Sequence, residues 1–356
     1  MTLLRTYLVM AVLRGVATVM AVLVAITCVI EFVQQLNDVG TGDYGVQTAL
    51  IYIALRVPRT VFQTLPIGAL IGSLLSLGNL AVHRELIVMR ASGVSSLQML
   101  SAVGLAGLML AVLVVLLGES VAPSLGAYAS ELRTRAMHEE IAVADGQATW
   151  LREGDRIVAL RRQAGDLGYG DGVLLFELGP EQTLRQVARA DSANLEENRW
   201  VLSNYAETSF EEGVVTVRTA GRESSEKHGL NPDLLELSVV RADLLDTPSL
   251  IRYISYLRAN SLDAHRYLVA YWSRLANVFS VVIMTVLALP FVFGGLRSAG
   301  AGARLLVGLI IGLTYYVAGQ VLTSGGEVYG VNPVVIAWAP TALLVLVTSF
   351  AFARMR

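Results

Sequence analysis

The sequence predicts a polytopic α-helical membrane protein, with six transmembrane helices in two groups of three and an all-β domain inserted between the groups. The composition supports this class, because 54% of the 356 residues are hydrophobic and only 16% are charged, a balance that soluble domains rarely reach. Six runs of residues are long and apolar enough to cross a bilayer. One long polar segment divides them and carries short apolar stretches of the kind that form strands.

The six apolar runs set the expected domain boundaries. A helix needs about 20 apolar residues to cross the roughly 30 Å hydrocarbon layer. The candidate spans lie at about 12–34, 61–80, 97–118, 268–293, 305–323 and 333–352. We therefore expect a first membrane region at 1–118, which includes a short polar helix at about 80–96. An outer domain at 119–250 and a second membrane region at 251–356 follow.

The placement of arginines predicts the orientation. Arg5 and Arg14 precede the first span, and no small-residue cleavage site follows it, so we expect this helix to remain uncleaved. The other arginines near the spans, on the same side by this reading, are Arg84, Arg90, Arg297, Arg304, Arg354 and Arg356. The opposite short loops, "NDVGTGDYG" and "TSGGEVYGVNP", contain no Lys or Arg. The positive-inside rule then places both termini in the cytoplasm and residues 119–250 in the periplasm of a Gram-negative inner membrane.

The polar segment is typical of an acidic β-domain. It holds 13 basic and 23 acidic side chains, against 14 and 6 in the rest of the chain. Short runs rich in Val, Leu, Phe, Tyr and Trp alternate with turn signals such as "GYGDG" and "EENR", which predicts a small sandwich or jelly roll. Its inward-facing side chains are expected to include Leu160, Leu175, Trp200 and Tyr205. After it, Thr247 as the cap and Pro248 in the first turn predict a helix. Its apolar residues recur at helical spacing, which predicts an amphipathic helix at the interface: Leu250, Ile251, Ile254 and Leu257.

The chain lacks the residues for ATP chemistry of its own. Its single lysine, Lys227, does not follow a glycine-rich turn, as a phosphate-binding P-loop requires. If ATP drives this protein, a partner chain must bind the nucleotide and its Mg²⁺. One cysteine, Cys28, and four scattered histidines make no disulfide framework or metal cluster, and no catalytic triad is recognisable. We therefore expect no catalytic residue, no metal site and no cofactor bound by this chain.

Three strings of the sequence resemble the lipopolysaccharide export permeases, and the resemblance covers essentially the whole chain. They are "LPIGALIGSLLSLGNLAVHRELIVMRASGVSS", "GESVAPSLGAYASELRTRAM" and "YLVAYWSRLANVFSVVIMTVLALPFVFGGLRS". The stretch "EFVQQLNDVGTGDY" is similar to the LptG-type subunit rather than to its LptF-type partner.

This resemblance implies a transport mechanism. Two related permease subunits, of the LptF and LptG types, form one transmembrane cavity, and two copies of an LptB-type ATPase dock beneath them in the cytoplasm. A bitopic LptC-type partner also associates. Lipopolysaccharide enters the cavity from the outer leaflet, ATP binding and hydrolysis push it upward, and the β-domains pass it to a periplasmic bridge. No nucleic acid is expected among the partners.

The resemblance assigns the short polar helix to coupling with the ATPase. Family members carry an acidic residue in it, which maps to Glu85. This carboxylate would pair with a basic residue in a groove of the ATPase, an interaction that gives orientation more than affinity. Leu86 and Met89 are expected to fill that groove. Arg84 and Arg90 can add contacts there, although the positive-inside rule alone also explains them.

At the outer end of the first helix, this chain differs from the lipid-binding pattern of the family. Some family members place lysines there, where they meet the lipid A phosphates, but this chain has Glu31, Asn37 and Asp38. Carboxylates repel phosphate unless a divalent cation bridges them. The acids can instead pair with an arginine of a partner, or they can be interfacial acids that reach toward water.

Basic and apolar candidates for lipid contact lie elsewhere in the spans. Arg133 matches a basic position of the family, and arginine suits bidentate contacts to phosphate. Arg135 is a weaker candidate, because it can pair with Glu131 or Glu139 at helical spacing. The candidates for lining an acyl-chain cavity, which helix packing explains nearly as well, are Ile67, Leu70, Tyr315 and Tyr316.

Two alternatives to the LptG-type assignment stay open. The chain can be the paralogous LptF-type subunit of the same exporter. It can also be a non-transporting mechanotransmission or signalling protein that binds an ATPase, which needs the coupling helix but no lipid cavity between its spans.

Overall fold

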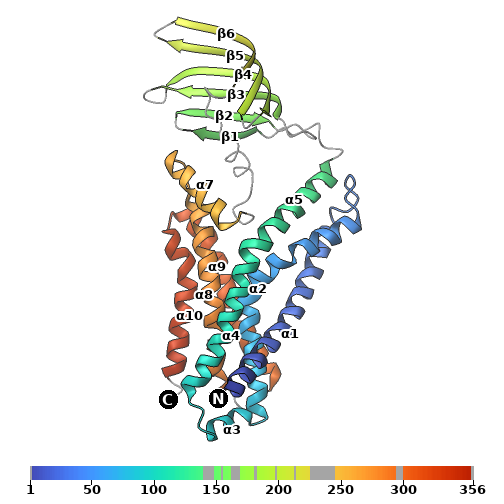
Figure 1. The fold of residues 1–356 in the computed structure, drawn as a ribbon, viewed down its shortest axis with the longest axis vertical. Coiled ribbons are helices and arrows are strands. Elements are labelled where there is room, and N and C mark those ends of the chain that lie inside the picture. The colour runs from blue at the N-terminus through green and yellow to red at the C-terminus, as the bar shows by residue number, and fades with distance from the viewer. Residues whose placement is uncertain are drawn as a thin grey trace. The chain divides into compact units, whose positions relative to one another are not determined.

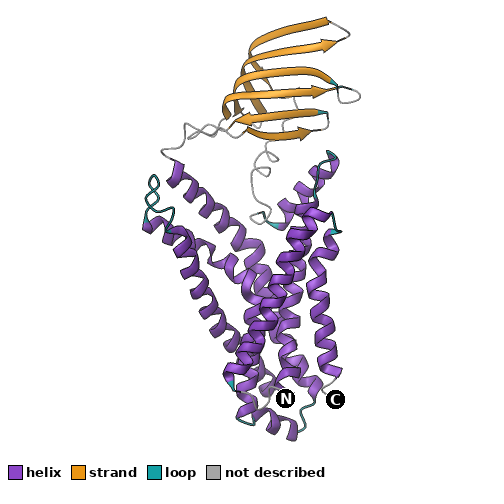
Figure 2. Ribbon diagram, turned by 180° about the vertical axis from the view of Figure 1, so that it is seen from behind, coloured by secondary structure: helices purple, strands orange, loops and turns teal. Residues whose placement is uncertain are grey.

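The structure is a computed structural model, and its described residues are 2–138, 148–153, 155–161, 169–179, 183–196, 199–211, 214–224, 245–293 and 300–353. The chain divides into two compact units. The helical unit comprises residues 1–40, 44–133 and 265–356, and the β unit comprises residues 41–43 and 134–264. Figure 2 shows the helices in purple and the strands in orange.

The helical unit is a bundle of long helices (Figure 1). Its elements are α1 (Thr2–Gln35), α2 (Val46–Val82), α3 (Glu85–Ala91), α4 (Ser96–Leu116), η1 (Leu117–Val121), α5 (Ala122–His138), α8 (His265–Phe293), α9 (Ala301–Tyr329) and α10 (Pro333–Ala353). Within the described part of the chain, six helices are long and apolar enough to cross a membrane, which confirms the predicted number. The short helix α3 lies at the same end of the bundle as both chain termini.

The helices extend beyond the predicted apolar spans. α2 begins at Val46 instead of about residue 61, because Arg56 and Pro58, which resemble a flanking loop in the sequence, lie inside the helix. A proline inside a helix removes one backbone hydrogen bond, which membrane helices tolerate when neighbouring groups satisfy the freed carbonyl.

The third span does not end at residue 118 as predicted. α4 continues through η1, a single π-helical turn, into α5, so the helical unit extends to Arg133. Gly118 lies in this turn against Phe62 of α2, where an added Cβ would come within 2.5 Å of the Phe62 ring. Such π turns insert one residue into a helix and redirect its surface.

α2 is the central helix of the bundle and packs against α1, α8 and α9. In its most apolar stretch 67% of the residues are buried, whereas the corresponding values for α1 and α9 are 11%. The backbones of α1 and α2 touch where Gly15 meets Gly72. An added Cβ on Gly15 would lie 2.6 Å from the Gly72 carbonyl oxygen, and one on Gly72 would lie 2.5 Å from the Val16 Cα atom. Glycine therefore permits this helix crossing.

The β unit contains one antiparallel sheet of six strands in the order β1-β2-β3-β4-β5-β6. The strands are β1 (Ala148–Glu153), β2 (Arg156–Arg161), β3 (Tyr169–Leu178), β4 (Leu184–Glu196), β5 (Arg199–Glu211) and β6 (Val214–Ser224). The predicted inserted β structure is thus confirmed. Each described strand pairs with its neighbours in sequence, since short connections favour hairpins, and this part of the chain shows no Greek-key crossover of a jelly roll.

One face of the sheet carries the apolar core of the β unit. Register pairs Val158 with Leu175 and Leu175 with Ala188, and side chains opposite one another share a face. Leu202 and Tyr205 belong to the same buried cluster, which confirms the predicted inward position of Leu175 and Tyr205. The side chains of Leu160 and Trp200 lie outside the described residues.

The predicted amphipathic helix is α7 (Thr247–Ala259), which buries Leu250, Tyr253, Ile254 and Leu257. Its N-cap is Asp246, whose Oδ1 atom accepts a hydrogen bond from the Ser249 N–H at 3.3 Å. The expected cap, Thr247, is instead the first residue of the helix. A carboxylate at this position also interacts favourably with the helix dipole.

The glycine crossing of α1 and α2 yields a first prediction. Gly72→Ala should destabilise the folded chain by about 1–3 kcal/mol, because the new methyl group collides with backbone atoms that have no rotamer to adopt. The matched control is Gly104→Ala in α4, where no atom lies within 4 Å of the added Cβ. The control should be neutral or slightly stabilising, since alanine favours helix. Thermal unfolding in detergent measures both, and equal midpoints for the two variants would contradict the prediction.

Candidate functional site

The short helix α3 is defined by the turns on either side of it. Arg84 precedes it in the left-handed conformation (φ 61°), a strained geometry for a residue with a side chain. Gly93 follows it with φ 92°, where glycine is free of that strain. Ser95 and Gln98 then form a capping box that begins α4. These turns place α3 as a separate, short helix at the end of the bundle.

The side chains of α3 divide between a buried and an exposed face, and this division corrects one prediction. Leu86 and Met89 are 1% and 6% exposed and belong to the core of the helical unit, so they anchor α3 to its own bundle and are not free to fill a groove of a partner. The exposed apolar side chains are Ile87 and Val88. Arg84 is exposed too and lies four residues before Val88, a spacing that shares a helix face.

Glu85 and Arg90 both contact other helices of the unit. The Tyr7 hydroxyl in α1 donates a 2.7 Å hydrogen bond to Glu85 Oε2. Arg90 donates to Ser96 Oγ at 3.1 Å, and its guanidinium lies 5.2 Å from the centre of the Phe293 ring. Arg90 therefore stabilises the turn between α3 and α4, a role that the sequence did not suggest.

At the other end of α1 lies an ion-pair cluster that we call the Tyr52 cluster: Glu31, Asp38, Tyr52, Arg56 and Arg133. Arg56 Nη1 lies 3.5 Å from Glu31 Oε1 and donates to the Tyr52 hydroxyl at 3.1 Å. Arg133 Nη2 donates to Asp38 Oδ2 at 2.6 Å. The two guanidinium carbons lie 5.3 and 5.6 Å from the centre of the Tyr52 ring, within the range of cation–π attraction.

The Tyr52 cluster revises the prediction for the acidic residues of the first helix. Glu31 and Asp38 pair with arginines of their own chain, so neither a bridging cation nor a partner's arginine is needed to compensate their charge. Arg56, which is partly exposed, is held by Glu31. Arg133 Nε is buried and has no hydrogen-bond acceptor among the described residues, so this guanidinium keeps one unused donor. Asn37 is exposed beyond the end of α1.

A buried tyrosine closes the loop beside this cluster. The Tyr44 hydroxyl donates to Gln35 Oε1 at 3.0 Å, and the Tyr44 side chain is fully buried. Burial raises the pKa of Tyr44 above its ordinary value, although the nearby positive charge of Arg133 opposes this. The phenol therefore remains protonated and keeps its donor. Neither Tyr44 nor Tyr52 belongs to a motif of the sequence, and only the helical spacing of Tyr52 and Arg56 indicates a contact.

The predicted acyl-chain residues lie mostly in helix packing. Leu70 is fully buried in the core, which excludes it from an open cavity. Ile67 packs against Gly312 of α9, and the Tyr315 hydroxyl lies 3.4 Å from Thr341 Oγ1. Of the four, only Tyr316 is more than half exposed. Arg135 is exposed in the part of α5 that belongs to the β unit.

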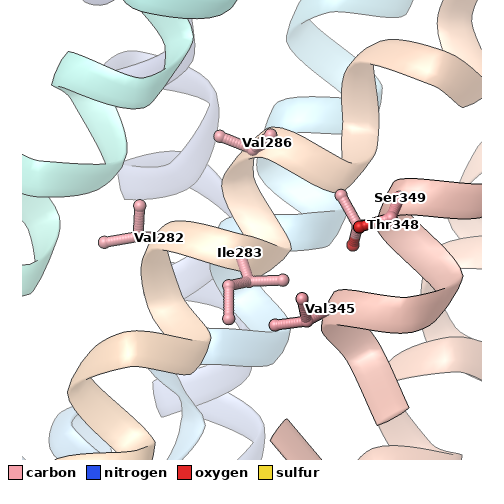
Figure 3. Close-up of a pocket in the computed structure, with 6 residues that line it drawn as sticks. All are labelled: Val282, Ile283, Val286, Val345, Thr348 and Ser349. Carbon is pink, nitrogen blue, oxygen red and sulfur yellow. The ribbon is translucent and has the colours of Figure 1, made fainter. Parts of the chain in front are cut away.

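A small apolar pocket, which the sequence did not predict, lies between α8 and α10 (Figure 3). It has a volume of about 240 Å³, and its lining residues are Val282, Ile283, Val286, Val345, Thr348 and Ser349. The Thr348 hydroxyl donates to the Leu344 carbonyl at 2.6 Å, so it satisfies the helix backbone and offers no donor to a ligand.

The fold and these sites define a multi-pass membrane protein with a short helix at one end of the bundle and an inserted antiparallel sheet. Residues 6–354 match the protein family described as "Lipopolysaccharide export system permease LptF/LptG", and the chain belongs to this family. LptG of Escherichia coli K12 is 32% identical over 334 residues, which cover 93% of this chain and 92% of that protein. LptG of Haemophilus influenzae is 29% identical over 352 residues, which cover 98% of both.

These similarities identify the chain as a lipopolysaccharide export permease subunit of the inner membrane. Both relatives carry the LptG name, which favours the LptG type over the LptF type. The family comprises transport subunits rather than enzymes.

The Asp38–Arg133 pair yields a second prediction. Asp38→Asn and Arg133→Gln should be non-additive, with a coupling energy of about 1 kcal/mol, because a charge-assisted hydrogen bond is strong but these side chains are partly exposed. The measurement is a double-mutant cycle of thermal stability. The matched control is Asp43→Asn, an exposed acid of the same loop, which should be additive with Arg133→Gln. If the effects of Asp38→Asn and Arg133→Gln are additive, the ion pair contributes nothing to stability.

Proposed function

We propose that this chain is the LptG-type subunit of an ATP-driven exporter that extracts lipopolysaccharide from the inner membrane and passes it to a periplasmic bridge toward the outer membrane. It pairs with an LptF-type subunit, two copies of an LptB-type ATPase and an LptC-type bitopic protein. The observation that carries this proposal is the family match over residues 6–354. The geometry of α3 supports the coupling to an ATPase.

The exposed face of α3 is suited to docking in a groove of the ATPase. Ile87 and Val88 are exposed apolar side chains on a helix that is itself anchored by buried residues. Helices that dock into grooves use such apolar anchors. Glu85 and Arg84 flank them with charge, which orients the partner and selects the correct one. Leu86 and Met89 act indirectly, since they fix α3 on the bundle.

ATP and its Mg²⁺ are bound by the separate ATPase in this proposal. The single lysine of the chain has no P-loop context. The arginine distribution supports a cytoplasmic location for α3 and both termini, and a periplasmic location for the β unit.

Arg133 is the best-supported contact for a lipid phosphate. Its guanidinium is partly exposed, and arginine binds phosphate through two parallel hydrogen bonds, one of which would use the Nη2 donor that now contacts Asp38. A phosphate would therefore compete with Asp38 for this side chain. Arg135, which is exposed two residues further along the same helix, is the second candidate.

Reconstitution separates transport from the non-transporting alternative. The chain is assembled with its partner permease, the bitopic protein and the ATPase in liposomes that contain lipopolysaccharide. ATP-dependent release of lipid to a bridge protein supports the proposal, whereas ATP turnover without lipid movement supports a mechanotransmission role. Complementation of cells depleted of either LptG or LptF distinguishes the two permease types, and rescue only of LptF depletion would reject the LptG assignment.

The coupling helix yields a third prediction. Glu85→Lys should abolish assembly with the ATPase or reduce ATP-driven lipid release at least about tenfold, since it places a like charge against a basic residue of the partner, at a cost of more than 1.4 kcal/mol. Val88→Asp should have the same effect by placing a charge on the apolar contact face. The measurements are co-purification of the ATPase and lipid release.

A charge change far from α3 provides the control for this test. Asp43→Lys alters the net charge equally but lies beyond the opposite end of α2, so the ATPase should co-purify normally. If Glu85→Lys preserves both assembly and transport, the assignment of α3 as the coupling helix is wrong.

A further inference from the structure

α1 is held firmly to the rest of the helical unit beside α3. Leu8 and Val9 of α1 are 2% and 6% exposed, and they belong to the same buried core as Leu86 of α3. This shared core fixes the start of α1 next to the short helix. Tyr7, which directly precedes these buried residues, donates a hydrogen bond to Glu85.

We propose that Tyr7 is a positioning residue for Glu85, which it holds in the orientation that meets a basic group of the ATPase. This inference rests on the proposed function, because it takes α3 as the helix that the ATPase moves. Tyr7 acts through Glu85 and makes no contact with the lipid in this proposal.

The Tyr7 hydroxyl is well placed to fix the Glu85 carboxylate. The 2.7 Å bond joins residues that are 78 positions apart in the sequence, so it is a tertiary contact between α1 and α3. Hydrogen bonds to an ionised acceptor are short and stronger than neutral ones. The Tyr7 hydroxyl bonds to Oε2 of Glu85, and the second carboxylate oxygen has its own lone pairs. Oε1 can therefore accept from a basic group of the ATPase while Tyr7 holds Oε2.

The test uses the complete exporter reconstituted with lipopolysaccharide. Tyr7→Phe removes one oxygen and keeps the ring, so the complex should assemble normally. Lipid released per ATP hydrolysed should fall about threefold to tenfold, the effect of losing one hydrogen bond to a charged acceptor. The matched control is Tyr128→Phe, which removes a hydroxyl from an exposed tyrosine of α5 and should leave the ratio unchanged.

A double-mutant cycle distinguishes positioning from a general structural role. In a Glu85→Gln background, Tyr7→Phe should cause no further loss, because its effect passes through the carboxylate. Additive losses in the two variants would overturn the positioning role. So would a Tyr7→Phe exporter with the wild-type ratio of lipid to ATP.

If the wild-type exporter hydrolyses ATP but moves no lipid, the proposed function fails, and this outcome is separate from those for Tyr7.

Discussion

The backbone contact between Gly15 of α1 and Gly72 of α2 sets the arrangement on which the helical unit depends. Lipid tails are as apolar as leucine side chains, so helices in a bilayer gain little from burying apolar area and associate through close packing. α9 follows the same rule, because Gly308 and Gly312 face isoleucines of α2. Two helices that expose most of their apolar surface are thus held to α2 at glycine positions. Their exposed faces remain available to lipid or to other membrane helices.

How much of this fold the sequence could predict depends on the range of the interactions. The six spans were predictable, because the thickness of the bilayer demands about 20 apolar residues whatever the tertiary contacts. The start of α2 was not, since Arg56 and Pro58 are typical of a loop. Arg56 is stable inside the helix because Glu31, from another helix, compensates its charge, and a hydropathy pattern contains no information about such a partner.

The same limit applies to the candidate sites. The position of α3 was predictable, but its exposed face was not, because residues 86–89 are all apolar and a helix of two turns shows no periodicity. The prediction that Leu86 and Met89 face a partner was therefore wrong. The Asp38–Arg133 pair joins residues that are 95 positions apart. Only the contact of Tyr52 with Arg56, one helical turn away, was within reach of sequence spacing.

The paired carboxylates of the Tyr52 cluster oppose the phosphate binding that we propose for Arg133. Two carboxylates and two guanidinium groups make it nearly neutral, so long-range attraction for an anion is weak. Because the side chains of the Asp38–Arg133 pair are partly exposed, their net attraction is about 1 kcal/mol. A phosphate must replace that attraction when it displaces Asp38 from Arg133, and the freed carboxylate must then reach water.

In the proposed function, binding of phosphate to Arg133 and release of the end of α1 from α5 are therefore one coupled step. If lipid favours the released state by some factor, the released state favours lipid by the same factor, because coupling free energies are reciprocal. Any motion of the exporter that separates the end of α1 from α5 would then raise the affinity for lipid at Arg133. The ATPase need not touch the lipid site to change how tightly the site binds, because the coupling acts through the Asp38–Arg133 pair.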